Sequence, residues 1–155
     1  MIFNSNKIFF YRNNEMVRKF PYSKAKKDLK NILNYIRNNE NDKKKLSMSI
    51  HFIDSEKMKE LNNEHRNKNS STDVLSFPHN EYDKNFFYIG DIFINENIIE
   101  EQSKEIGSDP LTEIKFLSMH GMLHLIGYAH TKKQDEIIMI KKQKEIFNKL
   151  RIRND

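Results

Sequence analysis

Three histidines lie close together between His120 and His130, and their spacing suits the binding of a metal ion. His120 and His124 are four residues apart, so on an α-helix their rings project from the same face, one turn apart. Gly127 permits a left-handed backbone turn, after which the chain can fold back and bring His130 to the third corner of a site. Three neutral imidazoles with one open position form the ligand set of a catalytic zinc ion. We therefore predict one Zn²⁺ per chain, bound by His120, His124 and His130, although imidazole ligands also accept other divalent ions.

A zinc ion at this position would lower the pKa of a bound water towards 7 and polarise a phosphoryl or carbonyl oxygen. Metallopeptidases with the pattern H-E-x-x-H-x-x-G-x-x-H share this histidine spacing and use the glutamate as a general base. This chain has Gly121 at the glutamate position, where no side chain can take a proton. The segment therefore disfavours a metallopeptidase and favours attack of a metal-bound hydroxide on a substrate rich in negative charge.

The residues around the first two histidines predict that they lie on one long helix. Asp109 can cap the start of this helix, and Pro110 suits its first position. We expect the helix to run to about Ile126 and to stop at Gly127.

Periodicity elsewhere predicts a small sheet with several further helices, the clearest strand being the alternation of apolar and polar residues at 47–52. Strands are expected at residues 7–11, 47–52, 72–77 and 86–95, the last two as a hairpin. Helices are expected at residues 23–37, capped by Ser23, at 96–106, ended by Gly107, and at 132–150, with a short helix opened by Asp54 and Ser55. The predicted fold class is α+β: a single domain over residues 1–155 with a small mixed sheet packed with several helices.

Composition excludes several classes of protein. The chain has 155 residues, a net charge of +5, and neither cysteine nor tryptophan, so disulfide scaffolds, thiolate zinc sites and cysteine nucleophiles are excluded. Aromatic residues make up 11% of the chain, which argues against disorder. No apolar stretch approaches the roughly 18 to 20 residues of a membrane span, and we expect a soluble, cytoplasmic protein without a membrane partner. The positive charge is compatible with a nucleic-acid partner, although lysine is common throughout the chain.

Three segments resemble the YbeY family of endoribonucleases, also called rRNA maturation factors. Residues 120–130 resemble the family signature H-G-x-L-H-L-x-G-x-D-H. Residues 61–68 and 71–78 resemble its block L-N-x-x-x-R-x-K followed by T-D-V-L-S-F-P, and residues 90–92 resemble its G-D-I/L strand. Spacing and order agree, so the resemblance covers roughly residues 54–139.

The resemblance implies a fold, an activity and site residues. It implies that His120, His124 and His130 hold zinc and that Arg66 is needed for activity, so we expect Arg66 and His120 to be catalytic. The planar guanidinium of Arg66 suits phosphate oxygens and could stabilise charge on the phosphodiester in the transition state. The implied activity is zinc-dependent cleavage of single-stranded RNA during maturation of the small-subunit rRNA 3′ end and ribosome quality control. The implied partners are single-stranded RNA, small-subunit rRNA, the ribosome and ribosome-assembly proteins, and the implied fold is a small mixed sheet with helices.

One position departs from the family signature. The family usually has Asp just before the last histidine, and this chain has Ala129. A carboxylate there could orient a metal ligand or hold a water molecule. The alternative function is therefore an RNA-binding or ribosome-binding assembly factor with a largely structural metal and weak cleavage. The carboxylates that could compensate are Asp73, Asp91, Asp135 and Glu136.

The remaining candidates are weaker. Lys68 could contact phosphate and Tyr128 could stack on a base, so both are candidate substrate-binding residues. His51 and His79 are isolated in the sequence, and we expect them to be structural or surface residues. Asp91 lies among apolar strand residues, where it could hydrogen-bond either a loop or a metal-ligand histidine.

Overall fold

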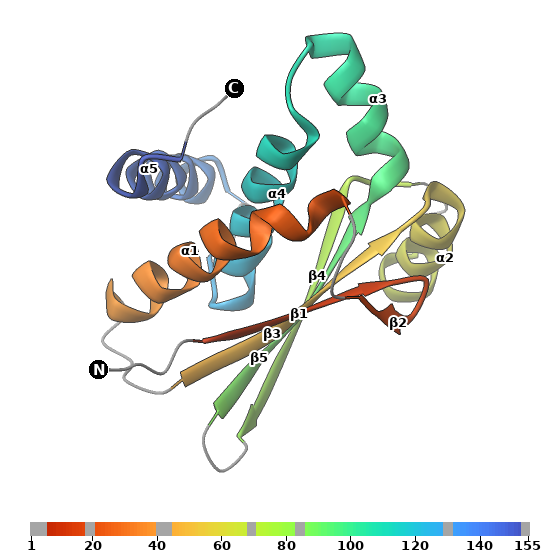
Figure 1. The fold of residues 1–155 in the computed structure, drawn as a ribbon. Helices are drawn as coiled ribbons and strands as arrows, with labels where there is room; N and C mark the ends of the chain where they lie inside the picture. The colour runs from red at the N-terminus through yellow and green to blue at the C-terminus, as the bar shows by residue number, and fades with distance from the viewer. Residues whose placement is uncertain are drawn as a thin grey trace.

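The structure is a computed structural model, and it describes residues 6–17, 21–39, 45–67, 71–82, 86–128 and 132–152 (Figure 1). The strands are β1 (Lys7–Arg12), β2 (Glu15–Met16), β3 (Lys45–Ile53), β4 (Val74–Tyr82) and β5 (Phe86–Asn95). The helices are the 3₁₀ helix η1 (Pro21–Ala25), α1 (Lys26–Asn39), α2 (Ser55–Arg66), α3 (Glu96–Ile106), α4 (Pro110–Leu125) and α5 (Lys133–Leu150).

The strands form one mixed sheet in the order β2-β1-β3-β5-β4. β1, β3 and β5 run parallel to one another, whereas β2 and β4 pair antiparallel at the two edges. The parallel pairs are connected through helices, as parallel strands require, and β4 and β5 form a hairpin. The predicted α+β class with a small mixed sheet is confirmed.

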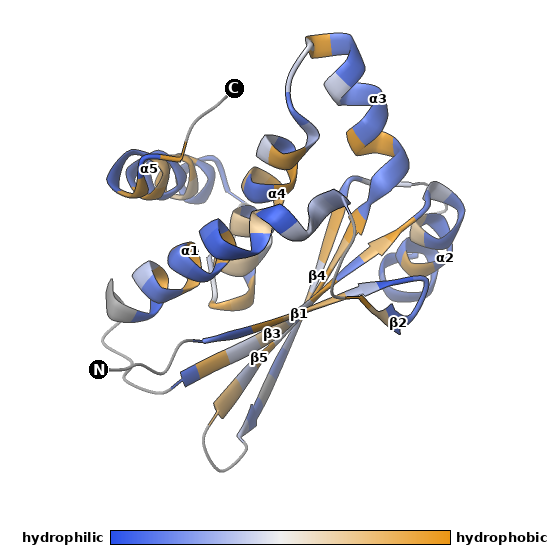
Figure 2. Cartoon of the chain, in the orientation of Figure 1, coloured by the Kyte–Doolittle hydropathy of each residue, from blue (hydrophilic) through white to orange (hydrophobic). Residues whose placement is uncertain are grey.

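Helices α1 and α4 cover one face of the sheet, with α5 packed against both of them (Figure 1). Apolar side chains from these helices and the strands form the main hydrophobic core between the layers. The middle of the sheet is accordingly hydrophobic, whereas the outward turns of α1 and α3 are largely hydrophilic (Figure 2). Core residues at this interface include Leu29 and Ile32 of α1, Met119, Met122 and Leu123 of α4, Met48 and Ile50 of β3, and Ile92 and Ile94 of β5.

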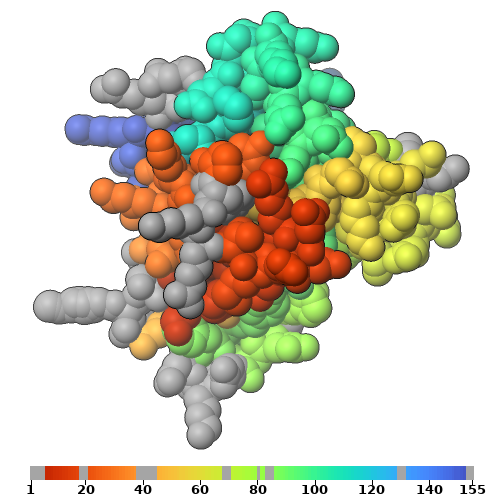
Figure 3. Space-filling view, turned by 45° about the vertical axis from the view of Figure 1, so that its right-hand side comes forward, coloured from red at the N-terminus to blue at the C-terminus, as the bar shows by residue number. Residues whose placement is uncertain are grey.

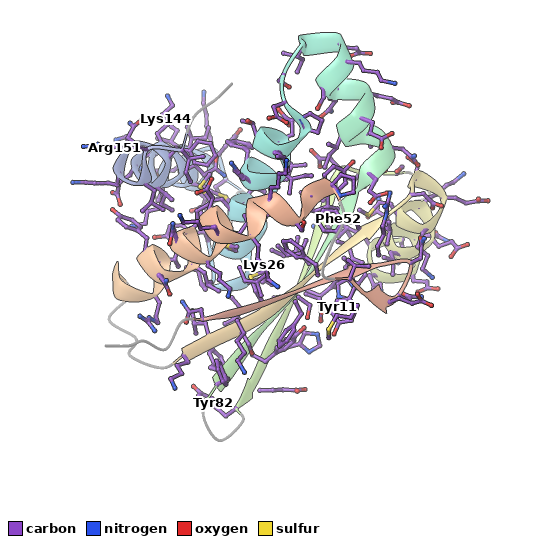
Figure 4. The ribbon with its side chains drawn as sticks, viewed as in Figure 1. Tyr11, Lys26, Phe52, Tyr82, Lys144 and Arg151 are labelled. Atoms are coloured by element: carbon purple, nitrogen blue, oxygen red, sulfur yellow. The ribbon has the colours of Figure 1, made fainter. Side chains whose placement is uncertain are left out.

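The opposite face of the sheet is covered at one end by α2. Met58 of α2 packs in a second, smaller cluster with Ile53 and Leu75, and Phe93 packs against that cluster. Phe93 lies between Ile92 and Ile94 on β5, so its side chain points to the other face from theirs. In the space-filling view α2 forms a lobe at one side of the molecule, away from α1 (Figure 3). In Figure 4 the side chain of Phe52 lies on the face of the sheet that packs in the main core, and that of Tyr11 lies on the opposite face.

The helix boundaries that depend on local signals are confirmed. The Asp109 carboxylate accepts a hydrogen bond from the Leu111 amide and Pro110 begins α4, while Asp54 caps α2 in the same way. Gly107 ends α3 with a φ of 75°, a left-handed conformation that favours glycine. The backbone of Gly127, just beyond α4, is also left-handed, with a φ of 111°.

Two details differ from the sequence-based expectations, and the burial of two serines is a third feature that the sequence did not indicate. Ser23 lies inside η1 and does not cap α1, because a 3₁₀ turn precedes the α-helix. β4 begins at Val74 and extends past Pro78 to Tyr82, since Pro78 lies on an edge strand where a missing amide donor is tolerated. Ser47 and Ser49 are buried although they lie on the face opposite the main core. Among the described residues, no helix is long and apolar enough to cross a membrane.

Candidate metal centre

The last turns of α4 hold His120 and His124 in contact. Their Nε2 atoms lie 3.0 Å apart, with ring centroids separated by 4.6 Å and planes crossing at 79°. Both rings are half-buried, and Met122, between them in the sequence, points into the core. The helix therefore directs two imidazole nitrogens towards one point, as the spacing predicts.

The other nitrogen of each ring is held by a neighbouring group. Nδ1 of His124 lies 2.8 Å from the carbonyl oxygen of Tyr128, which can only accept, so Nδ1 carries the proton and donates. Nδ1 of His120 lies 2.7 Å from the side-chain amide of Gln143 on α5. A neutral His124 therefore has its lone pair on Nε2, the atom that faces His120.

The donor set of this pair fits a divalent metal such as zinc. Ligand histidines usually donate their second ring nitrogen to a carbonyl or carboxylate, which fixes the tautomer and the ring orientation. Tyr128 supplies such a carbonyl to His124, and the Gln143 amide can present its oxygen to His120 by turning over. No group of three potential ligands is assembled within the described part of the chain, since His130 lies outside it. The ligand role of His130 stays a prediction.

Gln143 provides a first test of this arrangement. Replacing it with leucine removes the group that holds His120 Nδ1, and we expect zinc affinity to fall about 10- to 100-fold. Glutamate at this position can still accept from Nδ1, so Gln143→Glu is expected to keep most of the affinity. Competition with a chromophoric chelator measures the zinc dissociation constants of both variants. Equal affinities for the leucine and glutamate variants would contradict the positioning role.

A pocket of about 490 Å³ opens beside the histidine pair and includes His124 in its wall. Its size is typical of sites that accept small ligands. The pocket lies between the end of α1, the first residues of β3 and β5, Pro78 of β4 and the end of α4. The lining residues are Ile36, Arg37, Leu46, Pro78, Phe87, Ile89, His124, Leu125, Ile126 and Gly127.

Gly121 lies where α4 packs directly on β4 and β5. A Cβ atom on Gly121 would lie 2.7 Å from Cδ1 of Ile92 and 3.0 Å from Oγ of Ser76, so a side chain there would enter the core. The position that carries the general base in metallopeptidases thus faces the sheet in this fold. This packing supports the sequence argument against a metallopeptidase.

The contact at Gly121 predicts a cost of substitution. Alanine forces the flexible end of Ile92 aside, and we expect Gly121→Ala to destabilise the fold by about 1–3 kcal/mol, the usual range for overpacking. Urea unfolding monitored by circular dichroism measures this change. An unchanged midpoint would mean that α4 lies further from β5 than the structure places it.

The other predicted site residues have different positions. Arg66 is the exposed last residue of α2, which packs on the face of the sheet opposite α4. The structure thus brings His120 and His124 together and places Arg66 on a separate element, so its catalytic role stays a prediction. Tyr128 is half-buried against the main core, and its carbonyl contacts His124. Lys68 and Ala129 lie outside the described residues.

Sequence reasoning missed a polar cluster around Asp91, on the sheet face away from α4. The Asp91 carboxylate lies 2.8 Å from Nε2 of His51 and 3.0 Å from Nε2 of His79, and it accepts a 2.7 Å hydrogen bond from Tyr88. Burial raises the pKa of Asp91, but the hydrogen bonds from His51 and Tyr88 and the nearby histidine charges outweigh burial, so its pKa is lowered. His51 and His79 are thus structural partners of Asp91. These residues lie far apart in the sequence, so no local sequence pattern reveals the cluster.

Fold and site together define a mixed-sheet α+β protein whose central helix directs a histidine pair, with the chemistry of metal ligands, towards a pocket. The sequence profile of the family described as Endoribonuclease YbeY matches residues 10–151. The chain therefore belongs to the YbeY family.

Individual relatives agree with this assignment. Endoribonuclease YbeY from Clostridium botulinum strain 657 is 32% identical over 145 residues, covering 81% of this chain and 87% of that protein. Endoribonuclease YbeY from Sulfurihydrogenibium sp. is 38% identical over 143 residues, covering 90% and 93%. The solution structure of TM1509 from Thermotoga maritima matches with a TM-score of 0.57 and 27% identity, covering 93% of this chain and 91% of that one. The fold is thus shared with a solved structure over nearly the whole chain.

Proposed function

We propose that this chain is a zinc-dependent endoribonuclease that cleaves single-stranded RNA. The observation that carries the proposal is the convergence of His120 and His124, whose Nε2 atoms lie 3.0 Å apart beside a pocket, in a member of the YbeY family. The proposed biological role is maturation of the small-subunit rRNA 3′ end and ribosome quality control in the cytoplasm. In this proposal residues 1–155 act as one domain, with the ribosome and its assembly proteins as partners.

His120, His124 and His130 are the proposed metal ligands. A divalent ion held there would lower the pKa of a water molecule and polarise a phosphoryl oxygen. The chain's own groups prepare this site. The carbonyl of Tyr128 keeps the proton of His124 on Nδ1, so that Nε2 retains its lone pair. Gln143 holds the ring of His120 through Nδ1, which limits rotation of the second ligand.

Phosphodiester cleavage also needs stabilisation of the charge that develops on the phosphate oxygens. Arg66 is the proposed source, because the planar guanidinium matches two phosphate oxygens at once. Its support is the match of residues 61–68 to the family block. Arg66 and His120 remain the proposed catalytic residues, and Lys68 and Tyr128 the proposed substrate contacts.

A second candidate function is an RNA-binding or ribosome-binding assembly factor with a structural metal. The observation that favours it is Ala129, which stands where the family usually has a carboxylate. Asp91 does not replace that carboxylate at the histidine pair, because it is held by His51 and His79 on the other face of the sheet. The two functions differ in turnover, since an assembly factor binds RNA with little cleavage.

The deciding experiment compares cleavage of a labelled single-stranded RNA with cleavage of the same strand in a duplex. The full chain is assayed after chelator treatment and again after stoichiometric zinc is restored. The endoribonuclease proposal expects internal cleavage of the single strand that disappears with chelator and returns with zinc. Binding of RNA with no zinc-dependent cleavage would instead establish the assembly-factor function.

A further inference from the structure

The pocket beside His124 extends away from the histidines towards the end of α1 and the β4–β5 hairpin. Much of its wall is apolar, with Ile36 and Ile89 almost fully buried behind it. The described residues that line the pocket include one guanidinium and no carboxylate. A ligand that fits such a pocket combines an anionic group with a flat apolar part.

Arg37 supplies the positive charge. It is half-buried near the end of α1, in the same pocket wall as Ile36. A half-buried guanidinium attracts an anion more strongly than one in bulk water, because the local dielectric is lower. Its planar donor groups match the oxygens of a phosphate.

The β4–β5 hairpin supplies an aromatic surface to the same pocket. Phe87 lines the pocket, and the ring of Tyr82 stacks on it with centroids 4.4 Å apart and planes inclined at 24°. Tyr82 is 65% exposed, and it lies near the tip of the hairpin (Figure 4). Exposed aromatic rings of this kind stack on nucleobases with little sequence preference.

We propose that this part of the pocket binds one nucleotide of single-stranded RNA, with Arg37 contacting its phosphate and the Tyr82–Phe87 pair stacking on its base. The inference rests on the proposed function and adds to it a nucleotide subsite beside the metal centre. This subsite would also make the enzyme prefer single-stranded RNA, because a base in a duplex is already paired and stacked and cannot lie on Tyr82.

Fluorescence anisotropy tests the subsite with the zinc-loaded full chain and a labelled phosphorothioate RNA, which keeps the backbone charge and slows cleavage. We expect Tyr82→Leu to weaken binding about 10-fold, because stacking on one base is lost. Arg37→Gln should also weaken binding and should reduce the slope of log K against log salt by about 0.7, the value for one phosphate of a single strand. Tyr82→Phe should bind as the unsubstituted chain does, and Arg37→Lys should keep the salt slope.

Two control variants remove similar groups elsewhere. Phe116→Leu removes an aromatic side chain that is 40% exposed on α4, and Lys24→Gln removes an exposed positive charge on η1. Neither residue lines the pocket, and both variants should bind RNA normally. In cleavage assays of native RNA, the Tyr82 and Arg37 variants should raise KM with kcat nearly unchanged.

The outcomes separate the subsite from the proposed function. If the unsubstituted chain cleaves RNA but Tyr82→Leu or Arg37→Gln binds as tightly as the controls, the nucleotide subsite is wrong and the endoribonuclease stands. If the unsubstituted chain neither binds nor cleaves RNA, the proposed function is overturned, and the subsite with it. Weakened binding in both variants, with the salt slope changed only by Arg37→Gln, establishes the subsite.

Discussion

Zinc affinity is expected to fall at least about 100-fold when His124 is replaced by alanine, because loss of a ligand costs more than loss of a group that orients a ligand. RNA cleavage should fall to background in the same variant. The substitution removes one of the two nitrogens that meet at 3.0 Å, together with the hydrogen bond to Tyr128. Isothermal titration with zinc and the single-strand cleavage assay measure the two effects.

His79→Ala is the matched control for this prediction. His79 is 41% exposed through its side chain and contacts Asp91 on the face of the sheet away from α4. We expect this variant to bind zinc with unchanged stoichiometry and affinity. Normal zinc binding by His124→Ala, or a comparable loss in His79→Ala, would show that the metal is held elsewhere. Thermal unfolding of both variants separates ligand loss from loss of the fold.

The helix that carries the histidines could be predicted because its signals are local. Asp109, Pro110 and Gly127 act within one turn of the residues they affect, and the four-residue spacing of the histidines directly gives their shared face. The same holds for Gly107 at the end of α3. Such features depend on the conformational preferences of single residues and on their neighbours in the chain, and both can be read directly from the sequence.

The surroundings of the histidines could not be predicted in the same way. Gln143 reaches His120 from α5, and Arg37 enters the pocket wall from α1, because tertiary packing brings these helices together. The partnership of Asp91 with His51 and His79 likewise depends on the order of β3, β5 and β4 in the sheet. A single sequence gives no pairing between distant segments, so these contacts appear only once the topology is known.

Gly90 is expected to be among the least replaceable residues of the sheet. Its φ of 147° is a conformation that side chains rarely adopt, and a Cβ atom there would overlap the backbone carbonyl oxygen of Phe77. Backbone atoms of a paired strand cannot move aside as the end of a side chain can. Adding backbone strain to overpacking, we expect Gly90→Ala to destabilise the fold by about 3 kcal/mol or more. The melting temperature should then fall by about 6–12 °C in differential scanning calorimetry.

Gly107→Ala separates the cost of backbone strain from the cost of steric overlap by the added Cβ atom. Gly107 also has a positive φ, of 75°, but a Cβ atom there meets nothing within 4 Å. This variant should therefore show only the cost of the left-handed backbone, about 1–2 kcal/mol. Equal losses in the two variants would mean that the contact with Phe77 contributes nothing.

The substitution at Gly90 should also affect the metal centre. Cδ2 of Leu125 would lie 2.8 Å from the added Cβ, and Leu125 directly follows His124 in the last turn of α4. Where the side chain of Leu125 does not absorb this overlap, the last turn of α4 shifts and moves His124 relative to His120, which lies one turn earlier in the helix. We therefore expect folded Gly90→Ala to bind zinc more weakly than Gly107→Ala at a temperature where both are native. The absence of a side chain at Gly90 thus links the packing of α4 on β5 to the position of a proposed metal ligand.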